Sequence, residues 1–317
     1  MMFMLLGCLS LYAADNDLIT KQITIQLEKA GTLPDRIASS KKYKITNLKI
    51  IGEINGTDLK MIYEMVRGSY NDGKLYDGKL SVLDLSEARI VGGGDCYYKD
   101  LKSYYTSNDV IGSYAFHDCR ELTSLTLPAG ITSIDDKAFY GCSGLTSLTL
   151  PAGITSIGDE AFRDCSGLTS LNLPAGITSI GRFAFCGCSG LTSLNLPAGI
   201  TWIGGEAFWG CSGLTSIYVY AEKVPRIDSN AFGGFDAKKC TLYVPMGTYD
   251  DYWLSGFGDY FENIVEFDVT GIDKTTTSTD VEEIARYSVN GQRLSVPTKG
   301  LNIVKYSDGS VKKVAVR

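Results

Sequence analysis

SGLTSLTLPAGITSIGDEAFRDC, at residues 143–165, is one copy of a segment that recurs along the chain at a constant interval. A phenylalanine and a cysteine mark this interval through five copies, each 23 positions after the last. The phenylalanines are Phe116, Phe139, Phe162, Phe185 and Phe208, and the cysteines are Cys119, Cys142, Cys165, Cys188 and Cys211. Self-similarity at a fixed period of this length is the signature of a solenoid, in which each copy forms one coil of a stack.

The pattern inside one coil predicts two short legs. Apolar side chains alternate over residues 145–150, as expected of a half-buried strand. Pro151 then lacks a backbone donor and Gly153 tolerates a turn, so the strand ends there. Ile154 and Ile157 form a second apolar leg, and the coil closes on an Ala-Phe pair before the cysteine. The repeat therefore predicts a β-rich solenoid.

Stacking explains how such a coil becomes stable. Each position lies on its equivalent in the next coil, about 4.8 Å away, so like residues form continuous apolar columns. On the order of ten apolar side chains per coil, each contributing roughly 1.5–3 kcal/mol when buried, can offset the loss of chain entropy. A lone coil is not expected to fold. The ends need caps, because an open end exposes apolar surface and strand edges.

Degenerate copies of the strand pattern predict these caps. Upstream, residues 45–50 and 80–85 repeat the rhythm of the first strand with longer inserts, and residues 58–66 are expected to be helical. Downstream, a last strand at 241–245 runs into an aromatic segment at 249–261. We expect that segment to cover the open end of the stack.

Composition and charge exclude several classes of partner. The chain has 317 residues, 44% of them hydrophobic, and a formal charge of −6. Nucleic acid and anionic lipid are therefore not expected as partners, because binding them requires clustered lysine and arginine. Residues 281–317 hold seven basic and three acidic side chains, so this tail carries +4 and the remainder −10. The split predicts a separate C-terminal module.

The N-terminal segment at 1–14 predicts export. An apolar run is followed by small residues and then by a polar chain, which is typical of a signal peptide cleaved near Ala13 or Ala14. The run is too short to cross a bilayer as a helix, and no later segment approaches the roughly 18 apolar residues of a membrane helix. One alternative stays open: residues 5–8 resemble a lipobox, in which Cys8 carries a lipid anchor.

The repeat resembles the BspA-like, treponemal-type leucine-rich repeats of bacterial surface proteins, which have the form SLTSIxIPxxVTSIGxxAFxGC. The match covers residues 112–265, while residues 20–111 and 242–252 resemble the N-terminal portion and the end cap that accompany such repeats. The resemblance implies an α+β, β-rich leucine-rich repeat solenoid with a right-handed coil, from a Bacteroidota organism. Some members of this family are adhesins that bind host matrix proteins or other bacteria.

The tail carries a second resemblance. Residues 285–304 are similar to the C-terminal sorting domain of type IX secretion substrates, although Asn302 stands where an aromatic residue is usual. Asn290-Gly291 and Asp308-Gly309 are hairpin signals between alternating strands. The expected organisation is a signal peptide at 1–14, an N-terminal cap at 15–111, the solenoid with its C-terminal cap at 112–268, a linker at 269–280 and a small antiparallel β module at 281–317.

The chain lacks the groups that catalysis needs. His117 is its single histidine and occupies the variable position after Phe116, where we expect an exposed surface side chain. No Gly-x-Ser-x-Gly elbow, phosphate loop or His-Glu-x-x-His motif is present. The sequence therefore predicts a protein that is not an enzyme and that uses no cofactor.

The nine cysteines are expected to be structural. The repeat stacks five of them in one column, which suits reduced, buried thiols and does not converge on a tetrahedral zinc site. Disulfides between adjacent coils remain an alternative. Cys186 lies off the column and is expected to be exposed and reactive.

Acidic pairs at Asp135-Asp136 and Asp159-Glu160 occupy equivalent turns and raise the possibility of a calcium ladder. The next coil breaks the pattern with Arg182-Phe183. The pairs are therefore interpreted as solvated turns, and no metal site is expected.

Large side chains at positions that the repeat leaves free predict a binding surface. Aromatic rings and arginine are the usual anchors of recognition. The candidates are Trp202, Trp209, Tyr218, Tyr140, Arg163 and Phe183. We expect a monomer that binds a host matrix protein or a bacterial surface protein. Three alternatives stay open: a glycan stacked on the same rings, tryptophans that pack on the C-terminal cap, and a structural envelope component without a specific ligand.

Overall fold

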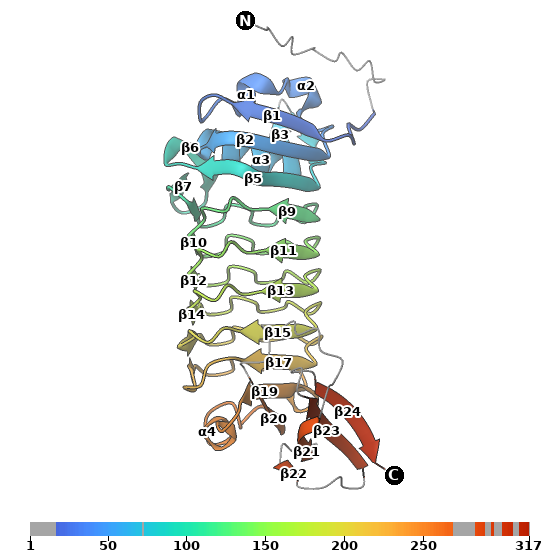
Figure 1. The fold of residues 1–317 in the computed structure, drawn as a ribbon. Coiled ribbons are helices and arrows are strands. Elements are labelled where there is room, and N and C mark those ends of the chain that lie inside the picture. The colour runs from blue at the N-terminus through green and yellow to red at the C-terminus, as the bar shows by residue number, and fades with distance from the viewer. Residues whose placement is uncertain are drawn as a thin grey trace, which may run out of the picture.

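The computed structural model describes residues 17–71, 73–268, 283–288, 293–294, 300–306 and 311–316. The expected signal peptide with Cys8 and Ala14, the linker at 269–280 and the two hairpin turns of the tail lie outside the described residues. Figure 1 shows an elongated stack of coils with a helix-bearing cap at one end and a small sheet at the other. No helix in the described part of the chain is long and apolar enough to cross a membrane.

One parallel sheet of ten strands runs the length of the stack (Figure 1). Its strands, in order, are β1 (Ile23–Leu27), β2 (Asn47–Ile54), β5 (Val82–Ile90), β9 (Ser124–Thr126), β11 (Ser147–Thr149), β13 (Ser170–Asn172), β15 (Ser193–Leu196), β17 (Ser216–Val219), β19 (Thr241–Pro245) and β20 (Asn263–Phe267). Leu148 pairs with Leu125 on one side and Leu171 on the other. Identical coils thus stack in register, with the leucines inside.

The second legs form a narrower parallel sheet of six strands. They are β8 (Val110–Ile111), β10 (Ser133–Ile134), β12 (Ser156–Ile157), β14 (Ser179–Ile180), β16 (Trp202–Ile203) and β18 (Arg226–Ile227). Isoleucine pairs with isoleucine along this sheet, as in Ile134 with Ile157. The predicted fold class, a β-rich leucine-rich repeat solenoid with a small antiparallel sheet after it, is confirmed.

A column of parallel phenylalanine rings fills the interior. Neighbouring ring centroids lie 5.0–5.3 Å apart, and the rings are within 8° of parallel. The column extends to Phe232, although the segment between Phe208 and Phe232 is one position longer than the repeat. All six side chains are fully buried. The insertion is therefore accommodated without breaking the core.

The cysteine column lies beside the rings, and its predicted burial is confirmed. The thiols of Cys142, Cys165, Cys188 and Cys211 each donate to a phenylalanine carbonyl of the preceding coil at 3.0–3.1 Å. Burial raises the pKa of the Cys211 thiol to about 12. Every cysteine in the described ranges is free, so no disulfide joins adjacent coils there.

The N-terminal cap closes the first end of the stack. It contains α1 (Leu33–Arg36), α2 (Ser39–Lys42), α3 (Gly56–Arg67) and two hairpins, β3 (Ser69–Asn71) with β4 (Lys74–Tyr76) and β6 (Gly93–Lys99) with β7 (Ser103–Thr106). Helix α3 starts with a capping box: Asn55 accepts from the Thr57 amide, and Asp58 accepts from the Asn55 amide. The predicted helix and the two degenerate strands are confirmed as α3, β2 and β5.

The C-terminal cap is built from the aromatic segment that was expected to cover the open end. It follows the short helix η1 (Ala237–Lys239) and strand β19, and it contains α4 (Tyr249–Trp253). Tyr252, Phe257 and Phe261 are fully buried, and Phe261 meets Phe232 edge-on with centroids 5.1 Å apart. The Tyr252 hydroxyl donates to the Ala221 carbonyl at 2.6 Å. The last ring of the column is therefore covered.

The tail forms a four-stranded antiparallel sheet. Its strands are β21 (Glu283–Ser288), β22 (Arg293–Leu294), β23 (Gly300–Tyr306) and β24 (Val311–Val316), in the order β22-β21-β23-β24. Tyr287 and Ile303 pack against Val265 of β20 and Tyr243 of β19. This small sheet is thus in contact with the end of the long sheet (Figure 1).

Candidate functional site

The surface richest in side chains that the repeat does not require is formed by the turns that follow the second sheet. We call it the turn face. Each turn contains the Ala-Phe-x-x-Cys sequence, and the amide of its phenylalanine donates to an alanine carbonyl one coil further on. The distance from Phe139 N to Ala161 O is 2.7 Å, and the equivalent bonds from Phe116, Phe162, Phe185 and Phe208 measure 2.7 Å or 2.8 Å. This ladder holds the turns at constant spacing, so equivalent residues stand in rows.

One row of the turn face has a left-handed backbone in every coil. The φ angles lie between 56° and 62° at Tyr114, Lys137, Glu160, Phe183, Glu206 and Asn230. Asparagine is among the side chains that tolerate this region best, whereas other L-residues lose roughly 1–2 kcal/mol there. Every residue of the row adopts this conformation whatever its side chain, so the left-handed backbone belongs to the turn of the repeat.

The turn face brings together three of the six predicted binding residues. The Arg163 guanidinium lies 5.8 Å from the ring centroid of Tyr140 and 5.3 Å from that of Phe183. Arg182 approaches the Phe183 ring to 5.8 Å, and Glu160 accepts from Arg163 at 3.2 Å. Tyr140, Arg163 and Phe183 are all half-buried, so each is supported by its neighbours and still reaches the surface.

Tyrosines from the N-terminal cap extend this cluster. The Tyr98 ring of β6 stacks on Tyr114 at 4.7 Å, and Tyr104 of β7 lies 4.8 Å from Tyr114. His117 in turn stacks on Tyr140 at 5.0 Å. We call the continuous set the aromatic ribbon; its members are Tyr98, Tyr104, Tyr114, His117, Tyr140, Arg163 and Phe183.

Sequence reasoning missed the three tyrosines at positions 98, 104 and 114. Tyr98 and Tyr104 belong to the β6–β7 hairpin, which lies outside the region of regular repeats. The signal for these two is the density of tyrosine between residues 97 and 105, whereas Tyr114 occupies the same variable repeat position as Phe183.

The prediction that His117 is an exposed surface side chain is wrong. Its side chain is 17% exposed and lies among Tyr98, Tyr114 and Tyr140. Burial lowers the pKa of the imidazole, while nearby Asp118 acts in the opposite direction. The neutral imidazole of His117, packed between tyrosines, therefore has a structural role in the aromatic ribbon.

Of the other three predicted binding residues, one lies further along the turn face and two lie on the sheets. Trp209 is on the turn face, 38% exposed, with its ring over the backbone of Gly233 and Gly234. Trp202 belongs to β16 of the second sheet and donates from its indole to Asp228 at 3.2 Å. Tyr218 belongs to β17 of the long sheet and stacks on Tyr243 at 4.3 Å. These three residues do not form one patch.

The prediction of an exposed, reactive Cys186 is also wrong. Its side chain is only 8% exposed, and burial raises the pKa of the thiol. Cys186 occupies the row of Tyr140, Arg163 and Trp209, where a thiol is too short to project as far as the larger side chains do.

The acidic turns use their carboxylates to join coils. Asp136 accepts from the Asp159 amide at 2.9 Å, and Asp159 accepts from the Arg182 amide at 2.7 Å. Among the described residues, no group of three or more histidine, cysteine or carboxylate side chains could hold a metal ion.

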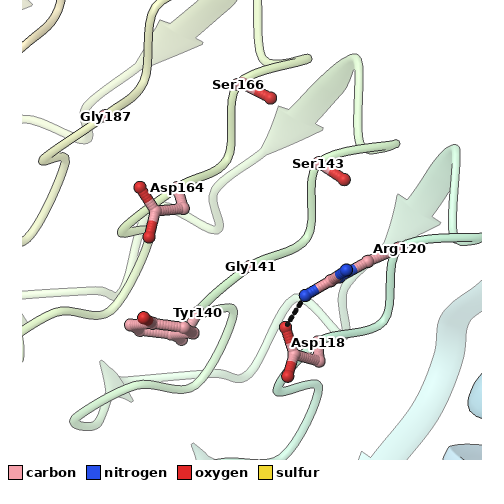
Figure 2. Close-up of a pocket in the computed structure, with 8 residues that line it drawn as sticks. All are labelled: Asp118, Arg120, Tyr140, Gly141, Ser143, Asp164, Ser166 and Gly187. Atoms are coloured by element: carbon pink, nitrogen blue, oxygen red, sulfur yellow. Dashed lines mark hydrogen bonds and ion pairs between the residues drawn. The ribbon is translucent and has the colours of Figure 1, made fainter.

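A hollow of about 320 Å³ lies beside the ribbon on the turn face (Figure 2). We call it the Gly141 hollow. It is lined by Asp118, Arg120, Tyr140, Gly141, Ser143, Asp164, Ser166 and Gly187.

Residues 109–238 match the family model of the BspA type leucine rich repeat region in six copies. This match and the two parallel sheets agree on the leucine-rich repeat fold. No curated protein matches the chain.

Solved structures of several bacterial proteins are similar to the chain. A leucine-rich repeat protein of T. pallidum shares 29% identity over 42% of this chain and 60% of its own, with a TM-score of 0.39. A leucine-rich cell surface protein of Faecalibacterium prausnitzii shares 22% identity over 69% of this chain and 51% of its own, with a TM-score of 0.40. The pneumococcal vaccine antigen PcpA shares 17% identity over 73% of this chain and 61% of its own, with a TM-score of 0.41. The chain thus spans less than two thirds of each of these proteins.

Proposed function

We propose that the protein is an exported, non-enzymatic binding protein that recognises a macromolecule through its turn face. The partner is a protein of the host matrix or of a bacterial surface. One observation carries the proposal: Tyr140, Arg163 and Phe183, three large side chains that the repeat does not require, lie against one another on the turn face and are half-buried.

The chemistry of the aromatic ribbon supports this role. Tyrosine and arginine are enriched among the residues that carry binding energy at protein interfaces. In the ribbon, Tyr140 is held between His117 at 5.0 Å and Arg163 at 5.8 Å. Because the rings are already ordered by stacking, little side-chain entropy is lost when a partner binds.

Export and surface location belong to the same proposal. Residues 1–14 read as a signal peptide, residues 109–238 match a BspA type repeat region, and residues 285–304 resemble a type IX sorting domain. These three features favour a protein of the Bacteroidota cell surface. The sole histidine, packed among tyrosines, supports a role without catalysis.

A binding screen of the full chain against arrayed matrix and bacterial surface proteins tests the proposal. The key variant is Phe183→Asn, which removes the ring and places a side chain tolerant of left-handed backbone at φ 56°. We expect at least a tenfold loss of affinity for the partner with no loss of thermal stability. Tyr140→Ser is expected to act in the same direction.

Variants on the two sheets are the matched controls. Trp202→Ser and Tyr218→Thr remove large rings from the second and the long sheet, away from the turn face. If Trp202→Ser or Tyr218→Thr abolishes binding and Phe183→Asn does not, the turn face is not the recognition surface. If no protein in the screen binds, the proposed partner class is wrong.

A further inference from the structure

The Gly141 hollow arises because aspartate and glycine alternate along one row of the turn face. This row also has a left-handed backbone, with φ of 55° at Asp118, 72° at Gly141, 60° at Asp164 and 74° at Gly187. A Cβ atom on Gly141 would lie 2.4 Å from an Asp118 carboxylate oxygen, and one on Gly187 would lie at the same distance from Asp164. Each carboxylate therefore leans over the glycine of the next coil. The surface above Gly141 is left recessed, with Asp118 and Asp164 on its two sides (Figure 2).

The lining of the hollow offers both hydrogen-bond donors and acceptors. Carboxylates accept, the Arg120 guanidinium donates, and the hydroxyls of Ser143 and Ser166 do both. Tyr140 adds a phenol group at one wall (Figure 2). Such a set fits a ligand whose own groups are each donor and acceptor at once.

The charges of the hollow are compensated within the protein. The Asp118 carboxylate receives a hydrogen bond from Arg120 at 3.2 Å and lies 3.8 Å from Arg67. The Asp164 carboxylate lies 3.7 Å from the Nε atom of Arg163. A cationic ligand would have to compete with three guanidinium groups, so the hollow favours a neutral polar ligand.

We infer that the Gly141 hollow is a subsite for one neutral sugar residue. Each sugar hydroxyl both donates and accepts, so it can bind carboxylate, guanidinium and serine together. The volume of about 320 Å³ lies at the lower end of the range of ligand pockets, which suits a single pyranose ring. The inference rests on the proposed function: the ribbon binds the protein part of a glycosylated partner, and the hollow binds one residue of its glycan.

Saturation-transfer NMR of the full chain tests this subsite. The probes are the methyl glycosides of glucose, galactose, mannose and N-acetylglucosamine, each in millimolar excess. We expect at least one glycoside to bind with millimolar affinity. Ser166→Leu fills the hollow and is expected to weaken that binding at least tenfold. Asp164→Asn keeps a residue tolerant of left-handed backbone, removes a charged acceptor and is expected to weaken it about fivefold.

Ser189→Leu is the matched control, because Ser189 occupies the same repeat position one coil further on and does not line the hollow. It should leave glycoside binding unchanged. Equal loss in Ser166→Leu and Ser189→Leu, or no signal from any glycoside, overturns the inference. Binding of Nα-acetyl-lysine methylamide, whose side chain is an ammonium cation, without any glycoside signal also overturns the inference, since the hollow then binds cations. Protein binding that survives Ser166→Leu but not Phe183→Asn leaves the proposed function standing.

Discussion

Replacing Phe162 with alanine should destabilise the solenoid more than any surface change. The ring is fully buried and stacks on Phe139 at 5.0 Å and on Phe185 at 5.2 Å. Truncating a buried phenylalanine typically costs about 3–5 kcal/mol, because both transfer energy and a cavity are involved. Loss of the two stacking contacts, about 0.5–1.5 kcal/mol each, places Phe162→Ala in the upper half of that range.

The backbone framework around this residue should survive the substitution. The Phe162 amide still donates to Ala184 at 2.7 Å, and its carbonyl still accepts from Cys188. Urea unfolding followed by circular dichroism measures the change in free energy. Because each coil contacts only its neighbours, a defect in a central coil weakens the interfaces on both sides of it.

Tyr140→Ala is the control for this measurement. It removes an aromatic ring from the turn next to Phe139, but that ring is half-buried rather than enclosed. We expect it to cost less than about 1.5 kcal/mol, well below half the cost of Phe162→Ala. If Phe162→Ala does not fold, Phe162→Leu, which conserves more volume, should cost about 1.5 kcal/mol and still rank above Tyr140→Ala. Equal costs for the buried and the half-buried ring would refute the stacked-column account of stability.

Three further predictions concern a histidine, a thiol and a glycine. His117, the sole histidine, should give one NMR titration curve with a midpoint below 6.5, because burial lowers its pKa; a midpoint at or above 6.5 would contradict its packing among tyrosines. Burial raises the pKa of the Cys211 thiol from 9.0 to about 12. The buried, protonated thiol therefore contributes to the free energy of unfolding below pH 9, and this contribution is lost as the pH rises toward 12. Unfolding free energies measured from pH 8 to 11 should fall less steeply in Cys211→Ala than in the parent chain, and equal slopes would count against this assignment. Gly167→Ala should cost about 1–3 kcal/mol, because the added Cβ would lie 2.3 Å from the Ser143 carbonyl oxygen. Gly153→Ala should cost less in the same unfolding assay, since its added Cβ would have its nearest neighbour 3.1 Å away.

Part of the candidate site could be predicted from the sequence. Tyr140, Arg163 and Phe183 stand out there because they depart from the repeat, and the structure brings them together. Trp202 and Tyr218 depart from it equally, yet they belong to two different sheets. A departure from the repeat consensus thus identifies a variable position, but it does not show which other variable positions lie on the same face of the coil.

The sequence by itself determined the coils, their register and their core. A residue repeated at a constant interval, such as Phe162 with Phe139 and Phe185, must stack on its own copies once the coils stack at all. The tertiary structure alone decided what surrounds the side chains that do not repeat. Tyr98 reaches Tyr114 through the fold of a hairpin, and Cys186 is buried although it lies off the cysteine column. Periodicity fixes which equivalent positions meet, whereas contacts between non-equivalent positions depend on how caps and turns pack in three dimensions.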